Sequence, residues 1–117
     1  AGFLAQHSRV SEVFYPGLES HAQFDVAKRQ MLRFGGMVSF RVRDGEQAAV
    51  DVCGRTKVFT LAESLGGVES LVEHPGRMTH ASVAGTALEV PSDLIRLSVG
   101  LEDVADLIAD LDQALSG

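Results

Sequence analysis

An apolar stripe near the C-terminus is the sequence feature that most constrains the fold. Its members recur at the three- and four-residue spacing of one helix face: Val104, Leu107, Ile108, Leu111 and Leu115. Glu102 and Asp103 precede the stripe, and we place both in the first helical turn, where the helix dipole favours acidic side chains. The pattern predicts a C-terminal helix with a single apolar face.

Four short segments predict β-strands. Two of them alternate apolar with polar residues, as a strand with one covered face does, and their apolar members are Val38, Phe40 and Val42 in one and Ile95, Leu97 and Val99 in the other. Arg96 lies on the opposite face of the second segment from these apolar neighbours. Apolar runs over residues 10–14 and 58–61 predict two further strands, the first ending at the turn-forming triplet Tyr15-Pro16-Gly17.

Helical spacing recurs in two earlier segments. Residues 21–33 predict a helix that ends before Gly35-Gly36, and Asp44 with Gln47 resembles a capping box for a short helix through Cys53. Residues 1–7 crowd apolar side chains like the last turns of a helix, so we expect a piece of a longer protein. Residues 80–93 show little pattern and predict a loop.

The order of these elements indicates the fold class. Strands and helices alternate, but the connections around Gly45 and Gly67 are too short or irregular for a series of parallel crossovers. We therefore predict one α/β domain over residues 1–117, an α+β two-layer sandwich with a mostly antiparallel sheet covered by helices.

Charge and composition exclude several functions. Sixteen acidic against ten basic residues give a net charge of −6, which would repel a nucleic-acid backbone. No apolar run reaches the ~18 residues of a membrane span, and the start lacks signal-peptide character, so we expect a cytoplasmic protein without membrane contact. The single cysteine, Cys53, predicts a small buried group, and the four histidines lack the spacing of metal ligands.

Two features exceed this background. The run Glu63-Ser64-Leu65-Gly66-Gly67 brings a carboxylate, a hydroxyl and exposed N–H groups to the end of a predicted strand, where they could hold a small polar ligand. The alternative is a turn that caps a helix over residues 68–72. The guanidinium of Arg96 matches a carboxylate in a two-pronged pair, and its alternative is a structural salt bridge with one of the acidic residues.

Six segments together resemble the C-terminal part of the Cys/Met-metabolism pyridoxal-phosphate enzymes. They appear in the family's order and span nearly the whole chain: residues 15–18, 34–40, 59–71, 73–75, 78–82 and 94–103. The resemblance implies the small C-terminal domain of a fold-type-I, aminotransferase-like enzyme. The large domain, absent from this sequence, would carry the Schiff-base lysine and most contacts to pyridoxal 5'-phosphate.

The resemblance also implies a role for individual residues. Arg96 matches the family's clamp for the α-carboxylate of the substrate, and Glu63, Ser64 and Leu65 match its cleft wall. Thr79 is a further substrate-binding residue acting from behind the wall. The chain's two lysines, at positions 28 and 57, lie outside the family's cofactor motif. We therefore predict no catalytic, cofactor-binding or metal-binding residue here, and no activity of the fragment alone.

The activity that the resemblance implies is γ-replacement. Cysteine would displace the γ-substituent of an O-acylhomoserine to form cystathionine, a step of transsulfuration and methionine biosynthesis. Glu63 and Gly67 favour the cystathionine group of the family over its methionine γ-lyases. The alternatives are γ-elimination of cystathionine and a non-catalytic module for ligand binding or oligomerisation. The partners implied are the amino-acid substrates, the large domain and further copies in a homotetramer.

Overall fold

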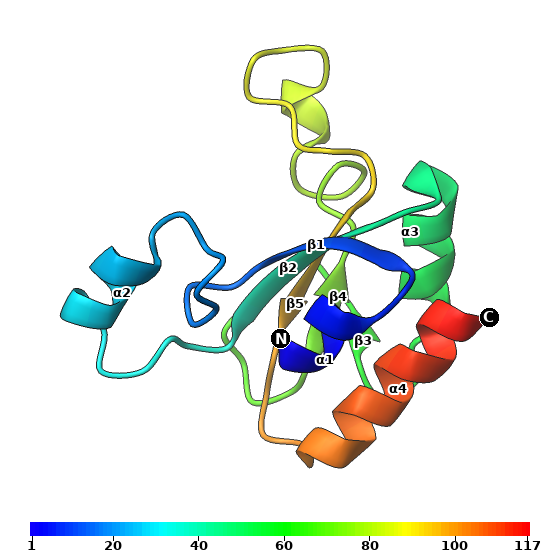
Figure 1. Ribbon diagram of the computed structural model, residues 1–117. Helices are drawn as coiled ribbons and strands as arrows, with labels where there is room; N and C mark the ends of the chain where they lie inside the picture. Colours follow the sequence, from blue (N-terminus) through cyan, green and yellow to red (C-terminus); the bar gives the residue numbers. More distant parts are fainter.

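The computed structural model describes residues 1–117, and its five strands form one sheet (Figure 1). In chain order the strands are β1 (Val10–Phe14), β2 (Met37–Val42), β3 (Thr60–Leu61), β4 (Leu71–Glu73) and β5 (Leu94–Ser98). Their spatial order is β1-β2-β5-β4-β3, and only the β3–β4 pair is parallel. The predicted mostly antiparallel sheet is confirmed.

Helices cover one face of this sheet. Four α-helices and a short 3-10 helix occur, namely α1 (Gly2–Gln6), α2 (Phe24–Gln30), α3 (Gly45–Arg55), η1 (Ala81–Val83) and α4 (Val104–Ser116). The helices α1, α3 and α4 contribute to a single apolar core with the sheet, whereas α2 lies to the side of it (Figure 1). The predicted two-layer α/β sandwich is therefore confirmed. None of the helices has the length and hydropathy needed to cross a bilayer.

The core lies between the sheet and this helical layer. Phe40 and Ile95, at the centre of the sheet, are 0% exposed. Leu111 and Leu115 of α4 and Cys53 of α3 pack in the same cluster. Burial raises the pKa of the Cys53 thiol to about 12, so the thiol stays protonated and acts as the small apolar group that was predicted.

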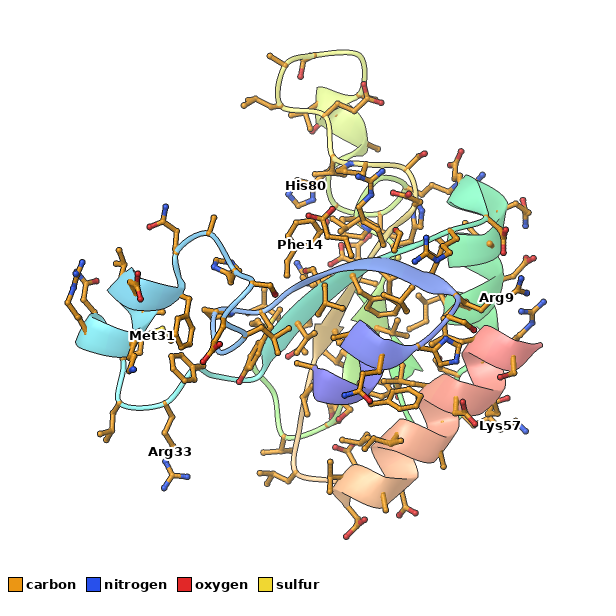
Figure 2. All side chains as sticks on the ribbon, viewed as in Figure 1. Arg9, Phe14, Met31, Arg33, Lys57 and His80 are labelled. Carbon is orange, nitrogen blue, oxygen red and sulfur yellow. The ribbon has the colours of Figure 1, made fainter.

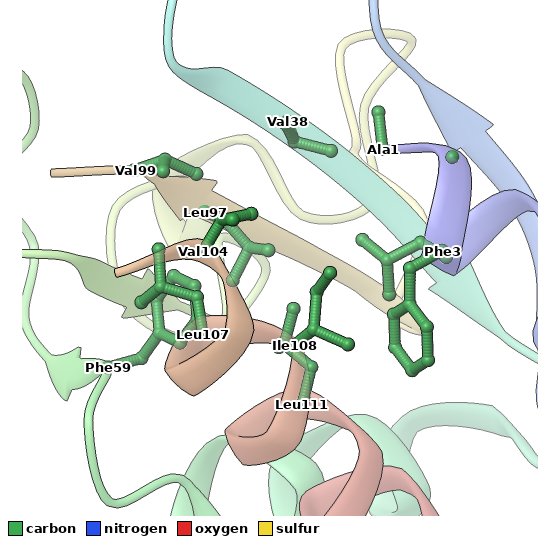
Figure 3. Close-up of a pocket in the computed structure, with 12 residues that line it drawn as sticks. Ala1, Phe3, Val38, Phe59, Leu97, Val99, Val104, Leu107, Ile108 and Leu111 are labelled. Carbon is green, nitrogen blue, oxygen red and sulfur yellow. The ribbon is translucent and has the colours of Figure 1, made fainter. Parts of the chain in front are cut away.

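The apolar stripe of α4 is only partly buried. Val104 and Ile108 remain exposed and line an open apolar cleft of about 300 Å³, together with Phe3 of α1 and Leu97 of β5 (Figure 3). The two acidic residues at the start of the helix, Glu102 and Asp103, have different roles. The Asp103 carboxylate caps the helix by accepting from the N–H of Ala105 at 2.8 Å.

Glu102 corrects the predicted start of α4, because it lies before the cap residue and outside the helix. Its carboxylate accepts hydrogen bonds from the N–H and the hydroxyl of Ser70, both at 2.7 Å. These bonds hold the pKa of Glu102 below its ordinary value. Glu102 therefore anchors the start of β4, and its role at the helix dipole was wrongly predicted.

Asp110 of α4 shortens the strand that was predicted over residues 58–61. Its buried carboxylate accepts from the N–H groups of Lys57, Val58 and Phe59 at 2.8, 2.8 and 2.9 Å. Strand pairing therefore begins only at Thr60. Burial raises the pKa of Asp110, but the three N–H groups and the amide of Gln113 outweigh that effect and lower it.

Two other local predictions were wrong. The carboxylate of Asp44 makes no bond to the start of α3 and instead pairs with Arg9 at 2.7 Å, so the capping box is absent. Residues 68–72 form no helix: residues 68–70 lead into β4, and residues 71–72 are its first two. The helix predicted over residues 21–33 is shorter than expected, whereas the loop over residues 80–93 contains only the three residues of η1.

Candidate functional site

The face of the sheet away from the helices carries a row of polar side chains. Arg96 of β5 stands opposite Ser39 of β2 on one side and opposite Glu73 of β4 on the other. Because side chains alternate along a strand, Arg96 points away from the face that buries its neighbours Ile95 and Leu97. The predicted mid-strand guanidinium thus lies on the opposite face from the core.

Arg96 forms an ion pair with Glu73. The Arg96 Nη2 contacts Glu73 Oε2, and the two side chains are 17% and 1% exposed. The same Nη2 lies 3.4 Å from the carbonyl oxygen of Glu63 and 3.3 Å from that of Ser64. The structural salt bridge expected as the alternative for Arg96 is therefore present, and it also brings Arg96 against the predicted cleft wall.

The other nitrogens of Arg96 have no acceptor in the chain. Its Nε is buried without a hydrogen-bond partner, and no residue accepts from its Nη1. A guanidinium offers five N–H donors, so the ion pair uses only part of its capacity. Arg96 is therefore held through Nη2, and the N–H groups of Nη1 have no acceptor within the chain.

Thr79 is joined to this pair through Glu73. Its hydroxyl donates to Glu73 Oε1, and because the hydroxyl has one proton, its oxygen accepts from His80 Nδ1 at 2.8 Å. Glu73 was not among the predicted site residues. The signal that could have found it is an acidic residue directly after the apolar pair Leu71-Val72, where charge is rarely buried without a partner.

The predicted cleft wall, residues 63–65, follows β3. Gly66 has a φ of +76°, a region that favours glycine, and its N–H donates to the hydroxyl of Ser98 at 2.7 Å. Leu65 is 56% exposed, and the side chains of Glu63 and Ser64 are exposed as well. Arg96 therefore donates to the backbone of residues 63 and 64 and makes no hydrogen bond to Leu65.

Gly100 fixes the far end of this wall. A Cβ on Gly100 would lie 2.2 Å from the carbonyl oxygen of Val68, which no side chain tolerates. The Gly100 N–H donates to the Ser70 hydroxyl at 2.8 Å, and Leu101 N–H donates to the Val68 oxygen at 2.9 Å. The end of β5 thus holds the segment that leads from the wall into β4.

The loop that carries Thr79 is anchored by His74. The buried His74 ring accepts from the N–H of Arg77 at Nδ1, so its Nε2 donates to the carbonyl oxygen of Ser92 at 2.7 Å. Arg77 in turn binds Glu46 of α3 at 2.6 Å, and this hydrogen bond and the charge of Arg77 lower the pKa of Glu46. The four histidines of the chain form no shared metal-ligating group.

The two lysines of the chain lie away from the polar face of the sheet. Lys28 is exposed on α2, with its ammonium 5.8 Å from the ring centroid of Phe24. Lys57 is exposed beside α4, and Figure 2 shows it well away from His80. Neither lysine reaches Arg96 or the cleft wall.

Comparison with known proteins adds the family. The family model described as Cys/Met metabolism PLP-dependent enzyme matches residues 1–116. Cystathionine gamma-synthase of Mycobacterium leprae is 67% identical over 99% of this chain and 30% of its own length. Cystathionine gamma-lyase of Dictyostelium discoideum is 52% identical over 97% of this chain and 30% of its own length.

A solved structure agrees with these relatives. The crystal structure of metB from Corynebacterium glutamicum superposes with a TM-score of 0.96 at 57% identity, over 98% of this chain and 30% of the other. The chain thus spans about 30% of the length of the proteins that it matches.

Proposed function

The chain belongs to the Cys/Met metabolism PLP-dependent enzymes, and on this premise we propose that it is the C-terminal substrate-cleft domain of a cystathionine γ-synthase. Identity of 67% to a relative named as a γ-synthase, against 52% to one named as a γ-lyase, supports that choice. The exposed positions of Lys28 and Lys57 support a separate large domain as the main holder of pyridoxal phosphate.

The proposed reaction exchanges one substituent for another. The bond between Cγ and the acyloxy oxygen of an O-acylhomoserine breaks, a bond from Cγ to the sulfur of cysteine forms, and the carboxylic acid leaves with the thiol proton. Pyridoxal phosphate supplies the electron sink for this chemistry when bound. The residues described here bind and orient the amino acid.

The observation that carries the proposal is the geometry of Arg96. Its Nη2 is held by Glu73 and the wall, its Nη1 is free, and its side chain is 17% exposed. A sheltered guanidinium with free N–H groups binds a carboxylate by charge-assisted hydrogen bonds. Arg96 therefore takes the α-carboxylate that all the substrates share, and so fixes where Cα and Cγ lie.

Glu63, Ser64 and Leu65 bind the remainder of the substrate. Their side chains are exposed on the segment whose backbone accepts from Arg96, so we expect them to face the part of the amino acid beyond its carboxylate. We expect Glu63→Ala to change the ratio of kcat/KM between cystathionine, acylated homoserine and methionine. A ratio equal to that of the wild type would mean that Glu63 acts only through its backbone carbonyl, which accepts from Arg96.

A cystathionine γ-lyase is the second candidate, because the relative from Dictyostelium discoideum covers almost the same residues. Both activities use the same carboxylate clamp and differ in the subsequent step at Cγ. The test is to assay the full-length enzyme with O-acetyl- or O-succinylhomoserine plus cysteine, and separately with cystathionine alone. Formation of cystathionine supports the synthase, whereas release of cysteine and a 2-oxo acid without synthesis supports the lyase.

The assembly and its location belong to the same proposal. The full-length enzyme would be a cytoplasmic homotetramer in which this domain packs on its own large domain. The open apolar cleft between α1, α4 and the sheet supports an additional apolar neighbour in the whole protein. Light scattering of the full-length enzyme tests the number of subunits directly.

A further inference from the structure

We propose that Glu73 is a positioning residue for Arg96, and that Thr79 holds Glu73 in place from behind. The proposal rests on the function proposed above, since it concerns how the carboxylate clamp is aimed. It assigns a role to a buried acidic residue that contacts neither substrate nor cofactor. Thr79 then acts through Glu73 and not through the substrate.

The first argument is the register of the strands. Glu73 and Arg96 are directly opposite on the antiparallel pair β4–β5, so their side chains rise from the sheet side by side. The paired strands fix both Cα positions. The geometry of the ion pair is therefore set by the sheet and not by a flexible loop.

The second argument is how the acceptors are distributed. Nη2 alone is engaged: it donates to the carbonyl oxygens of Glu63 and Ser64 and makes the ion-pair contact with Glu73 Oε2, which accepts no hydrogen bond. No acceptor in the chain takes a hydrogen bond from Nη1. A planar guanidinium gripped on one nitrogen has a fixed orientation, so Nη1 points in a constant direction with its donors unused.

The third argument is that Glu73 is itself held. Its side chain is 1% exposed, and its second oxygen accepts from Thr79, whose oxygen accepts from His80. A buried carboxylate needs hydrogen bonds as well as an opposite charge to offset its lost hydration. The Thr79 hydroxyl, itself bonded to His80, supplies one to Oε1, whereas Oε2 accepts no hydrogen bond and has the ionic contact with Arg96 Nη2 as its partner.

The test measures binding of L-norleucine and of pentylamine to the full-length, cofactor-loaded enzyme by calorimetry. Norleucine has no γ-leaving group, and pentylamine is the same molecule without its carboxylate. We expect Glu73→Gln to weaken norleucine binding about 10- to 100-fold and to leave pentylamine binding unchanged, because only the carboxylate uses the aimed guanidinium. In turnover, KM should rise for each α-amino acid substrate while kcat changes little.

Two substitutions of Thr79 test the proposal without replacing the buried carboxylate of Glu73. Thr79→Val should weaken norleucine binding about 3- to 10-fold, the usual effect of one lost hydrogen bond, and Thr79→Ser should restore it. Asp93→Asn is the matched control. It weakens the pair in which Asp93, the residue before β5, accepts from Arg41 of β2 at 2.8 and 3.1 Å, and it should leave norleucine binding unchanged.

The possible outcomes separate the two proposals. If the wild type binds norleucine no better than pentylamine, the carboxylate site itself is wrong. If the wild type discriminates but Glu73→Gln and Thr79→Val bind norleucine normally or more tightly, Arg96 is the clamp and Glu73 only neutralises or competes with it. Should Glu73→Gln fail to fold, the valine and serine variants of Thr79 decide the question.

Discussion

The two faces of the sheet differ in how their residues are held. On the covered face, Val38, Phe40, Ile95 and Leu97 pack against helices without a polar contact. On the opposite face, charged side chains pair with partners distant in sequence, as Arg96 does with Glu73 and Arg41 with Asp93. The covered face is stabilised by the apolar area that it buries, whereas the side chains of the polar face are positioned by individual hydrogen bonds and ion pairs. Substitutions on the two faces should therefore have different consequences.

The largest effect is expected on the covered face. Phe40→Ala removes a 0% exposed aromatic ring from the central pair of strands, which should lower the free energy of unfolding by about 3 to 5 kcal/mol. Its neighbour Ser39 faces the other side, and Ser39→Ala should change stability by under about 1 kcal/mol. Urea unfolding of both variants checks the contrast, and similar losses would show that the polar face also contributes to the core.

Arg96→Lys tests the polar face of the sheet in the same way. Lysine keeps the charge but lacks the fork, so the full-length enzyme should lose carboxylate binding worth about 2 to 5 kcal/mol, seen as a KM raised roughly 30- to several-thousand-fold. The cofactor spectrum should stay normal. A normal KM together with a lower melting temperature would make Arg96 a purely structural partner of Glu73.

Local patterns predicted the covered face well. The alternation in β2 and β5 and the apolar stripe of α4 arise from side chains close in sequence, and these elements lie where they were expected. The errors have non-local causes: Asp44 binds Arg9, and Asp110 takes the N–H groups that would have extended β3. Each partner lies more than 30 residues away, beyond the reach of any local pattern.

The polar face was only half predictable for the same reason. Arg96 could be recognised as a charge in mid-strand, and residues 63–65 as a polar turn after a strand. Glu73 could not be connected to Arg96, because the pairing of β4 with β5 follows from the strand order of the whole sheet.

Glycine substitutions compare the scaffold of the polar face with an open helical position. Gly100→Ala forces a Cβ into the Val68 carbonyl and should destabilise the chain by about 1 to 3 kcal/mol or more. Gly54→Ala in α3 meets no atom within 4 Å and should stabilise the chain by up to about 1 kcal/mol. Thermal melts of the two variants should shift in opposite directions, and a shift in the same direction would contradict the close approach at Gly100.

Asp110 adds a pH dependence to the comparison. Asp110→Asn weakens the acceptor for three N–H groups, which should cost about 1 to 3 kcal/mol at neutral pH. Since the folded-state pKa of Asp110 lies below the unfolded value of about 3.9, the ionised carboxylate stabilises the fold above that pH and loses this effect as the pH falls through the folded-state pKa. The stability gap between wild type and variant, measured in urea, should be constant from about pH 5 to 8 and shrink below about pH 4. A gap that stays constant at low pH would mean that the carboxylate is not the acceptor.

The central claim is that the polar face binds the α-carboxylate of an amino acid through Arg96. A crystal structure of the full-length enzyme with bound L-norleucine tests it most directly. We predict a carboxylate oxygen at about 2.7 to 2.9 Å from Arg96 Nη1, with Nη2 still on Glu73. A norleucine carboxylate bound only by residues of the large domain, with Arg96 contacting Glu73 alone, would contradict the claim.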